Sequence, residues 1–216
     1  MAAVACAAIV SWSCQSDGTS LPTPSGARAV RSVCPTPDAP DFYFAGGSFD
    51  PRQPDVDRES RAELSVFLSR VTQPTLSCGA NVDEAFRFIR LGHADIPTVI
   101  VVSRSDQGAS VSWVQMPDPA WQRTQVETSR GSTTISTDDW HALSTAVADI
   151  GFWSMEPAER ADVWAGPASA WVLEGRLNNS HHVVRRGYPR AGNLEGLGER
   201  FLRLTTLERV TLTANK

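Results

Sequence analysis

The chain has 216 residues, and its 20 Lys and Arg residues against 24 Asp and Glu residues give a formal net charge of −4. Hydrophobic residues make up 41% and charged residues 20% of the sequence, which suits a globular core. The charge balance argues against a basic nucleic-acid-binding protein, and the apolar content argues against an acidic disordered chain. The sequence contains no run of 18 apolar residues, so we expect no segment that crosses a membrane as a helix.

The first 14 residues, MAAVACAAIVSWSC, are mostly small or apolar and end in Ser13 and Cys14. A polar stretch rich in Pro, Ser and Gly follows. This order resembles a bacterial lipoprotein signal in which Cys14 carries the lipid. The alternatives are a secretory signal without lipid and an apolar N-terminus that has no targeting role. We therefore expect residues 1–14 to be a signal or lipid-anchor segment, and the protein to be lipid-anchored on the periplasmic side of the bacterial envelope, or secreted.

Residues 15–42 are rich in proline and serine, and proline disfavours helix both at its own position and at the preceding residue. We interpret them as a linker before one globular domain at residues 43–216. If Cys6 and Cys14 belong to the signal, two cysteines remain, Cys34 and Cys78. They would form a disulfide bond in an oxidising compartment, or be two buried thiols. The absence of a CxxC motif argues against a cysteine zinc site.

In chain order, the first predicted element is a helix that begins at Asp57 or Ser60 and runs to about residue 71, with apolar residues at positions i, i+3, i+4 and i+7. Residues 83–91 form either a short helix or a strand. Residues 97–103 are a β-branched run and predict a strand. A turn at residues 106–108 leads into a second strand at residues 109–116.

Residues 121–129 and 132–136 predict a hairpin across Arg130 and Gly131. Thr137 is the predicted cap of a helix that ends at Gly151, and residues 154–168 predict a loop. Two strands, at residues 171–177 and 181–187, are joined by a turn at residues 178–179, and a last helix covers residues 194–204. Hairpins imply an antiparallel sheet. The predicted class is therefore α+β: a single antiparallel sheet of hairpins with three to four helices packed on one face.

From about Asp83 onward the chain resembles a family of uncharacterised bacterial envelope proteins, many of them lipoproteins. The pattern that carries the resemblance is a set of short motifs: EAFRF at 84–88, Trp140, GFW at 151–153, WVLEG at 171–175, HVV at 182–184, Arg186 and Pro189. The family usually has Asp-Gly where this chain has Pro167 and Ala168. The resemblance implies an envelope location and no particular activity.

Glu174, His182 and Arg185 or Arg186 are the strongest candidates for a catalytic site, because they lie on two strands of one predicted hairpin. A Glu–His pair could act as a general base while an arginine holds an anion. The alternative is a structural Glu–Arg pair with His182 packed beside Trp171. Which residues meet depends on the register of the hairpin, because a slip of one residue moves every side chain to the other face.

Other polar groups give weaker signals. His181 and His182 point to opposite faces of a strand, so they cannot share one metal ion, and the pair His93 and Asp95 lacks a third ligand. Helix capping explains the aspartates of the group formed by Asp138, Asp139 and His141. The sequence predicts no metal site and no cofactor.

Trp121 and Trp164 lie in turn-rich stretches and are candidates for an exposed partner-binding surface, or for closing the core. We predict an envelope-anchored binding or structural protein whose partner is an envelope protein or a cell-wall component, with no role in binding nucleic acid. One alternative is a hydrolase-like enzyme that uses Glu174, His182 and Arg185. The other is an inhibitor or immunity protein against a toxin that acts on the envelope.

Overall fold

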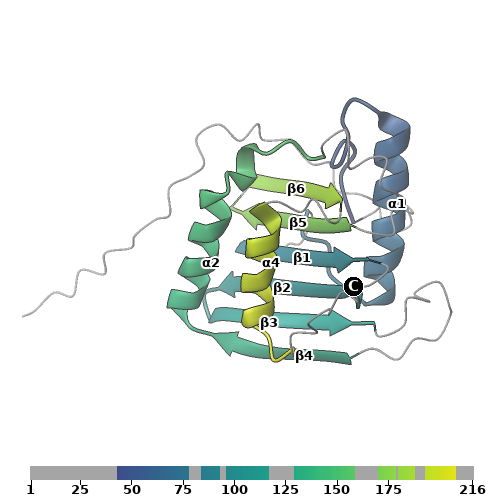
Figure 1. The fold of residues 1–216 in the computed structure, drawn as a ribbon. Coiled ribbons are helices and arrows are strands. Elements are labelled where there is room, and N and C mark those ends of the chain that lie inside the picture. The colour runs from purple at the N-terminus through teal and green to yellow at the C-terminus, as the bar shows by residue number, and fades with distance from the viewer. Residues whose placement is uncertain are drawn as a thin grey trace, which may run out of the picture.

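The structure is a computed structural model that describes residues 43–77, 84–92, 96–116, 129–158, 170–178, 180–187 and 193–207. Its elements in chain order are α1 (Pro54–Arg70), β1 (Glu84–Leu91), β2 (Thr98–Ser105), β3 (Gly108–Gln115), β4 (Ser129–Ile135), α2 (Thr137–Asp149), the 3₁₀ turn η1 (Phe152–Ser154), β5 (Ala170–Leu177), β6 (Ser180–Gly187) and α4 (Asn193–Arg203). The strands form one antiparallel sheet in the order β4-β3-β2-β1-β5-β6 (Figure 1). The predicted α+β class with a single antiparallel sheet is confirmed.

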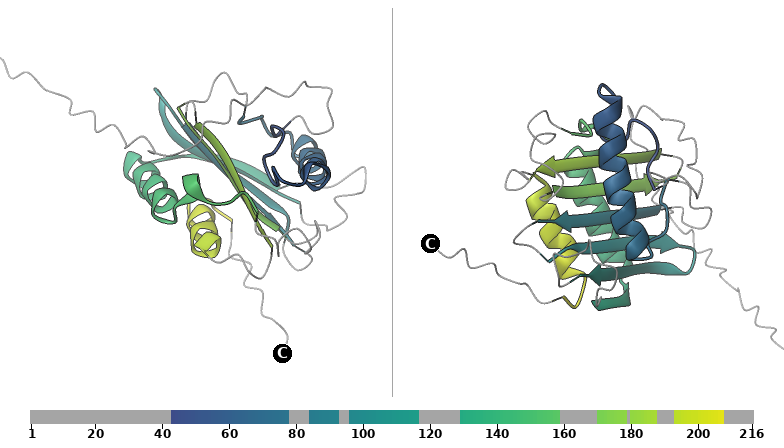
Figure 2. Two further views of the ribbon diagram at one scale, coloured as in Figure 1. Left: turned by 90° about the horizontal axis from the view of Figure 1, so that it is seen from above. Right: turned by 90° about the vertical axis from the view of Figure 1, so that its right-hand side faces the viewer.

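The helices lie on both faces of this sheet, whereas the sequence suggested a single face. Helix α1 crosses the strands on one side, and α2 and α4 lie on the other (Figure 2). Two apolar clusters account for this arrangement. One joins the sheet to Trp140 of α2 and Phe201 of α4. The other joins the opposite face to Phe67 and Leu68 of α1. Each face of the sheet therefore needs its own helical cover.

The central strands are buried on both faces, which explains why residues 83–91 were ambiguous. In β1, Phe86 and Phe88 face α2 and α4, and Ile89 and Leu91 face α1. A strand covered on both sides has no polar face, so its sequence loses the alternation that identifies a strand. The structure resolves the choice in favour of a strand.

The predicted hairpin across Arg130 and Gly131 is wrong, because both residues lie inside β4. Gly131 pairs with Trp113 of β3. The indole of Trp113 lies over this glycine, and a Cβ there would be 2.3 Å from Trp113 Cζ2. The glycine therefore gives room for a neighbouring ring and makes no turn.

Two predicted helix starts also shift. Pro54 occupies the first turn of α1, so Asp57 lies within the helix and caps nothing. Ser136, and not Thr137, caps α2: its hydroxyl accepts a hydrogen bond from the backbone N–H of Asp139, and the Asp139 carboxylate accepts one from Ser136 N–H. Within the described residues, no helix is long and apolar enough to cross a bilayer.

Candidate functional site

A buried ionic cluster lies on the α1 face of the sheet. Arg87 of β1 is directly opposite Glu174 of β5, and its Nε donates to Glu174 Oε2 at 2.8 Å. A second guanidinium nitrogen, Nη2, also contacts this oxygen. His181 of β6 joins the cluster through Nε2, which is 2.8 Å from Glu174 Oε1. The Arg87 and Glu174 side chains are 0% exposed, so the pair is removed from water.

The charges and hydrogen bonds around Glu174 determine its protonation state. Burial raises the pKa of Glu174, but the Arg87 charge and the hydrogen bonds from His181 and Arg87 outweigh burial and hold the pKa below its ordinary value. The carboxylate is therefore ionised at neutral pH. An ionised carboxylate only accepts hydrogen bonds, so Nε2 of His181 carries the proton. Nδ1 is then the nitrogen of His181 that is available to another partner.

The expected group of Glu174, His182 and Arg185 does not come together. The residue opposite Glu174 on β6 is Val183, and the imidazole that reaches it is that of His181. His182 points to the opposite face, where its ring contacts Phe152 at a centroid distance of 5.0 Å. Arg185 lies on the α1 face but donates to Ser60 Oγ at 2.8 Å.

A cavity of about 450 Å³ lies beside the first half of β6. Its lining consists of residues 45–48 and Pro51 before α1, residues 153–157 at the end of η1 and just after it, and residues 181–183 of β6. We call it the edge cavity, because β6 is the last strand at this side of the sheet. His181 and His182 both line it, although their side chains belong to opposite faces. Its size falls in the range of small-ligand sites, roughly 300–1,000 Å³.

One wall of the edge cavity is held by Asp57. Its Oδ2 accepts the backbone N–H of Gly47 and its Oδ1 that of Phe49, each at 2.8 Å. Arg61, one turn later in α1, donates to Oδ2 at 2.7 Å and balances the charge. The segment of residues 46–50 is thus fixed to the helix by a buried carboxylate.

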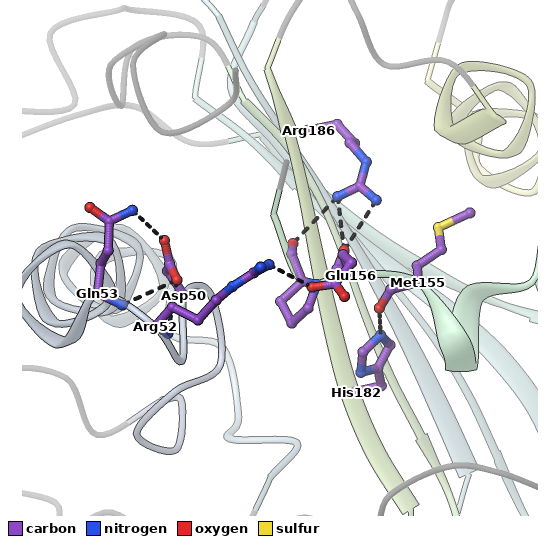
Figure 3. A network of polar contacts seen from close by, with 8 residues as sticks. Asp50, Arg52, Gln53, Met155, Glu156, His182 and Arg186 are labelled. Atoms are coloured by element: carbon purple, nitrogen blue, oxygen red, sulfur yellow. Dashed lines mark hydrogen bonds and ion pairs between the residues drawn. The ribbon is translucent and has the colours of Figure 1, made fainter. Parts of the chain in front are cut away.

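The second wall runs along the outer side of β6 (Figure 3). The Arg185 backbone N–H donates to the carbonyl of Pro157 at 2.7 Å, and both terminal nitrogens of Arg186 donate to the carbonyl of Glu156 at 3.1 Å. His182 Nε2 lies 3.0 Å from the Met155 carbonyl. Because a carbonyl only accepts, Nε2 of His182 also carries the proton. In both histidines Nε2 makes the hydrogen bond that holds the ring, so Nδ1 is the ring nitrogen that can interact with a ligand.

An ion pair joins the two walls. Arg52, which precedes α1, reaches across to Glu156, and its Nη2 is 2.9 Å from Glu156 Oε2 (Figure 3). Both side chains are about 70% exposed, so the pair adds little to stability. Its position allows it to influence how far apart the walls stand.

Burial lowers the pKa of His182 below the ordinary histidine value, and the positive charge of Arg186 lowers it further, against the opposing effect of the Met155 hydrogen bond. His182 is therefore neutral at pH 7. Within the described residues, no group of three or more His, Cys, Asp or Glu side chains is arranged to hold a metal ion. Asp139 of the group formed by Asp138, Asp139 and His141 is used in the α2 cap.

Several predicted residues lie outside the described part of the chain. These are Cys14, Cys34, Cys78, His93, Asp95, Trp121, Trp164 and the proline-rich linker. The lipid anchor, the disulfide bond and the exposed tryptophans therefore stay predictions.

The structure adds four residues that the sequence interpretation had given no role at a site: Arg87, Asp57, His181 and Trp153. Arg87 had a usable signal, because it is a charge inside the apolar run of residues 85–89, and a buried charge needs a partner. Glu174 lies in a similar run. Asp57 gave no such signal, because an aspartate near a helix start is ordinarily a cap.

The motifs behind the family resemblance meet in space. Arg87 of the first motif pairs with Glu174 of WVLEG, and Phe152 of GFW packs on Gly175. These contacts give the motif residues structural roles. In the comparisons with known proteins, no protein-family model matches the chain, and no curated protein matches it.

Proposed function

We propose that the protein is a binding protein of the bacterial envelope that takes a small ligand or a ligand segment into the edge cavity. The envelope location is supported by the lipoprotein-like segment ending at Cys14. The observation that carries the binding role is the fixation of the cavity walls. His181 is held by Glu174, His182 by Met155, and residues 46–50 by Asp57. A cavity whose polar groups are already fixed loses little conformational entropy when a ligand enters.

The edge cavity also has the lining expected of a binding site. The glycine-containing segment 45–48 and Pro51 offer small groups on one side, and Trp153 and Met155 offer an aromatic ring and a flexible apolar side chain on the other. The Nδ1 atoms of the two histidines are polar groups that can fix the orientation of a ligand. A ligand with an apolar body and hydrogen-bond donors fits this description.

The binding role is tested by a fragment screen on the ¹⁵N-labelled protein, followed by two-dimensional amide and indole NMR. We expect fragments to shift the signals of residues 181–183 and the indole of Trp153. Gly46 lines the cavity and has open space at its Cβ position, so Gly46→Phe should remove these shifts. Gly196 of α4 also has open space, and Gly196→Phe is the matched control that should leave them. Fragments that bind only elsewhere, or none at all, would refute the proposal.

The envelope location has its own test. Palmitate labelling of the expressed full-length chain should depend on Cys14 and disappear in Cys14→Ser. Unlabelled protein in the cytosolic fraction would contradict the anchor but leave the cavity proposal standing, because the two rest on different residues.

A hydrolase-like enzyme is the second candidate, and the Glu174–His181 contact favours it. A carboxylate that fixes Nε2–H of a histidine leaves Nδ1 as a base, which is an arrangement used in general-base catalysis. Arg87 shares the same carboxylate, which suits a structural pair equally well. His181→Gln separates the two: fragment binding with no turnover of ester or amide probes in either protein supports binding, and turnover lost in His181→Gln supports the enzyme.

A further inference from the structure

The two edge strands of the sheet, β6 and β4, differ in how far the described residues cover their outer sides. The outer side of β6 is covered by residues 155–157, which are held by Arg185 and Arg186. The other edge strand, β4, is exposed at Ser129, Arg130 and residues 132–134. Among the described elements, helices α1, α2 and α4 lie over the faces of the sheet and not beside its edges (Figure 1). Edge strands with free backbone groups tend to pair with another chain unless something covers or interrupts them.

Strand β4 lacks the usual features that prevent such pairing. Its sequence, SRGSTTI, contains no proline and no lysine, and Arg130 is its single charged residue. Its register with β3 is continuous over seven residue pairs, so no bulge bends it away. The side chains of residues 132–134 are small, uncharged and exposed.

The turn between β2 and β3 shows which backbone groups of β4 face outward. Ser105 and Gly108 flank the two-residue turn and form its closing pair. Bonding direction alternates along an antiparallel strand, so Val111 bonds toward β4, where its partner is Thr133. The backbone N–H and C=O of Ser132 then point away from the sheet. Within the described part of the chain, these groups of Ser132 have no hydrogen-bond partner.

We propose that this edge pairs with β4 of a second copy of the chain, antiparallel and across a two-fold axis at Ser132, so that one sheet continues through both protomers. In this register Ser132 pairs with Ser132 of the second copy, and Arg130 is opposite Thr134. An isologous contact of this kind closes on itself and gives a dimer, not a fibre. This inference rests on β4 alone and is independent of the edge cavity at β6.

The chemistry of β4 fits a second copy of itself. Like charges directly opposite one another destabilise a strand pair, and this register places no charge opposite its own copy. The central pair of this register would be two serines. Cross-strand Ser and Thr pairs form hydrogen bonds and are favourable. The strand is therefore self-complementary in backbone and side chains.

The first test is the solution mass of the purified full-length chain by sedimentation equilibrium over a concentration series. We expect twice the mass of the single chain, falling to a monomer on dilution. Ser132→Glu would place two carboxylates opposite each other and should give a monomer with an unchanged circular dichroism spectrum. Ser132→Ala is the matched control and should stay dimeric. A wild-type monomer at every concentration, or a Ser132→Glu dimer, would overturn the proposal, even if a strand of another protein were found to bind the same edge.

Cysteine cross-linking tests the register. Directly opposite residues in an antiparallel pair have Cα atoms about 4.5–5.5 Å apart, which a disulfide bond can span. Under mild oxidation Ser132→Cys should therefore form a covalent dimer beyond the wild-type background. The two copies of Thr134→Cys would be displaced by about four residues, or roughly 13 Å, and should not cross-link. Efficient cross-linking through position 134 and none through 132 would refute the two-fold axis at Ser132.

Discussion

The ring of Phe152 occupies the space in which a Cβ on Gly175 would lie, since that atom would be 2.6 Å from Phe152 Cε1. The contact ties η1 to the middle of β5 and so sets where the chain leaves η1 toward the wall at residues 155–157. The position of this wall of the edge cavity thus depends on a strand residue that has no side chain.

Gly175→Ala should destabilise the protein by about 1–3 kcal/mol, because the added methyl group overpacks the contact with Phe152. Urea unfolding followed by tryptophan fluorescence measures the change. Phe152→Leu in the same chain should recover part of the loss. Gly46→Ala is the control: no atom lies within 4 Å of its Cβ position, and its stability should change by less than about 0.5 kcal/mol. Equal effects at both glycines would contradict the packing argument.

Breaking the Arg87–Glu174 pair should be costly from either side. Arg87→Met leaves a buried carboxylate with one partner fewer, and Glu174→Gln leaves a buried guanidinium without its counter-charge, so each should cost about 3–5 kcal/mol. The double variant should lose less than the sum of the two, because it leaves no unpaired charge. Equilibrium unfolding of all four proteins gives the coupling energy. Additive losses would mean that the two side chains act independently.

The lowered pKa of His182 predicts a loss of stability in acid. The unfolded chain binds a proton below the ordinary value of 6.5, whereas the folded protein resists it. The contribution of His182 is therefore complete above pH 6.5 and is lost as the pH falls from there toward the lowered pKa. His182→Gln can still donate to Met155 and does not titrate. Its stability should fall less steeply than that of the wild type between about pH 7 and 5, and parallel curves would exclude His182 as the cause.

The sequence predicted Thr137 as the N-terminal cap of α2, whereas the structure assigns this role to Ser136. Ser136→Ala removes the hydrogen bonds to Asp139 and should cost about 1 kcal/mol. Thr137→Ala should be close to neutral, because the cap hydroxyl is that of Ser136. Thermal unfolding of the two variants decides the matter, and a larger loss for Thr137→Ala would place the cap one residue later than the structure does.

Strands joined by a recognisable turn were predictable even where both of their faces are buried. The two strands on either side of residues 178–179 appear almost where the sequence placed them, because Asn178 adopts the left-handed conformation of a tight turn, with φ 53°. Strand β1 was ambiguous because both its faces are buried. Gly131 was wrongly predicted to lie in a turn. The sequence alone does not distinguish a glycine that gives room to Trp113 from a glycine that allows the chain to turn.

The candidate site was only half predictable. Glu174 was predicted to meet His182, but the register of the hairpin decides which histidine reaches it, and because Val183 is opposite Glu174, that histidine is His181. The face covered by α1 was missed for a related reason. Hydrophobic residues on both sides of the central strands require cover on both faces, and a pattern of hairpins alone does not reveal this requirement.

Asp57 belongs to α1, yet its carboxylate holds the segment that forms one wall of the edge cavity. Any fluctuation that lifts α1 from the sheet also removes that wall, so the cavity exists only in molecules in which the helix is docked. By linkage, a ligand that needs the complete cavity shifts the equilibrium toward the docked helix. Amide hydrogen exchange in α1 should then slow when the cavity is occupied, even though the helix itself does not line it.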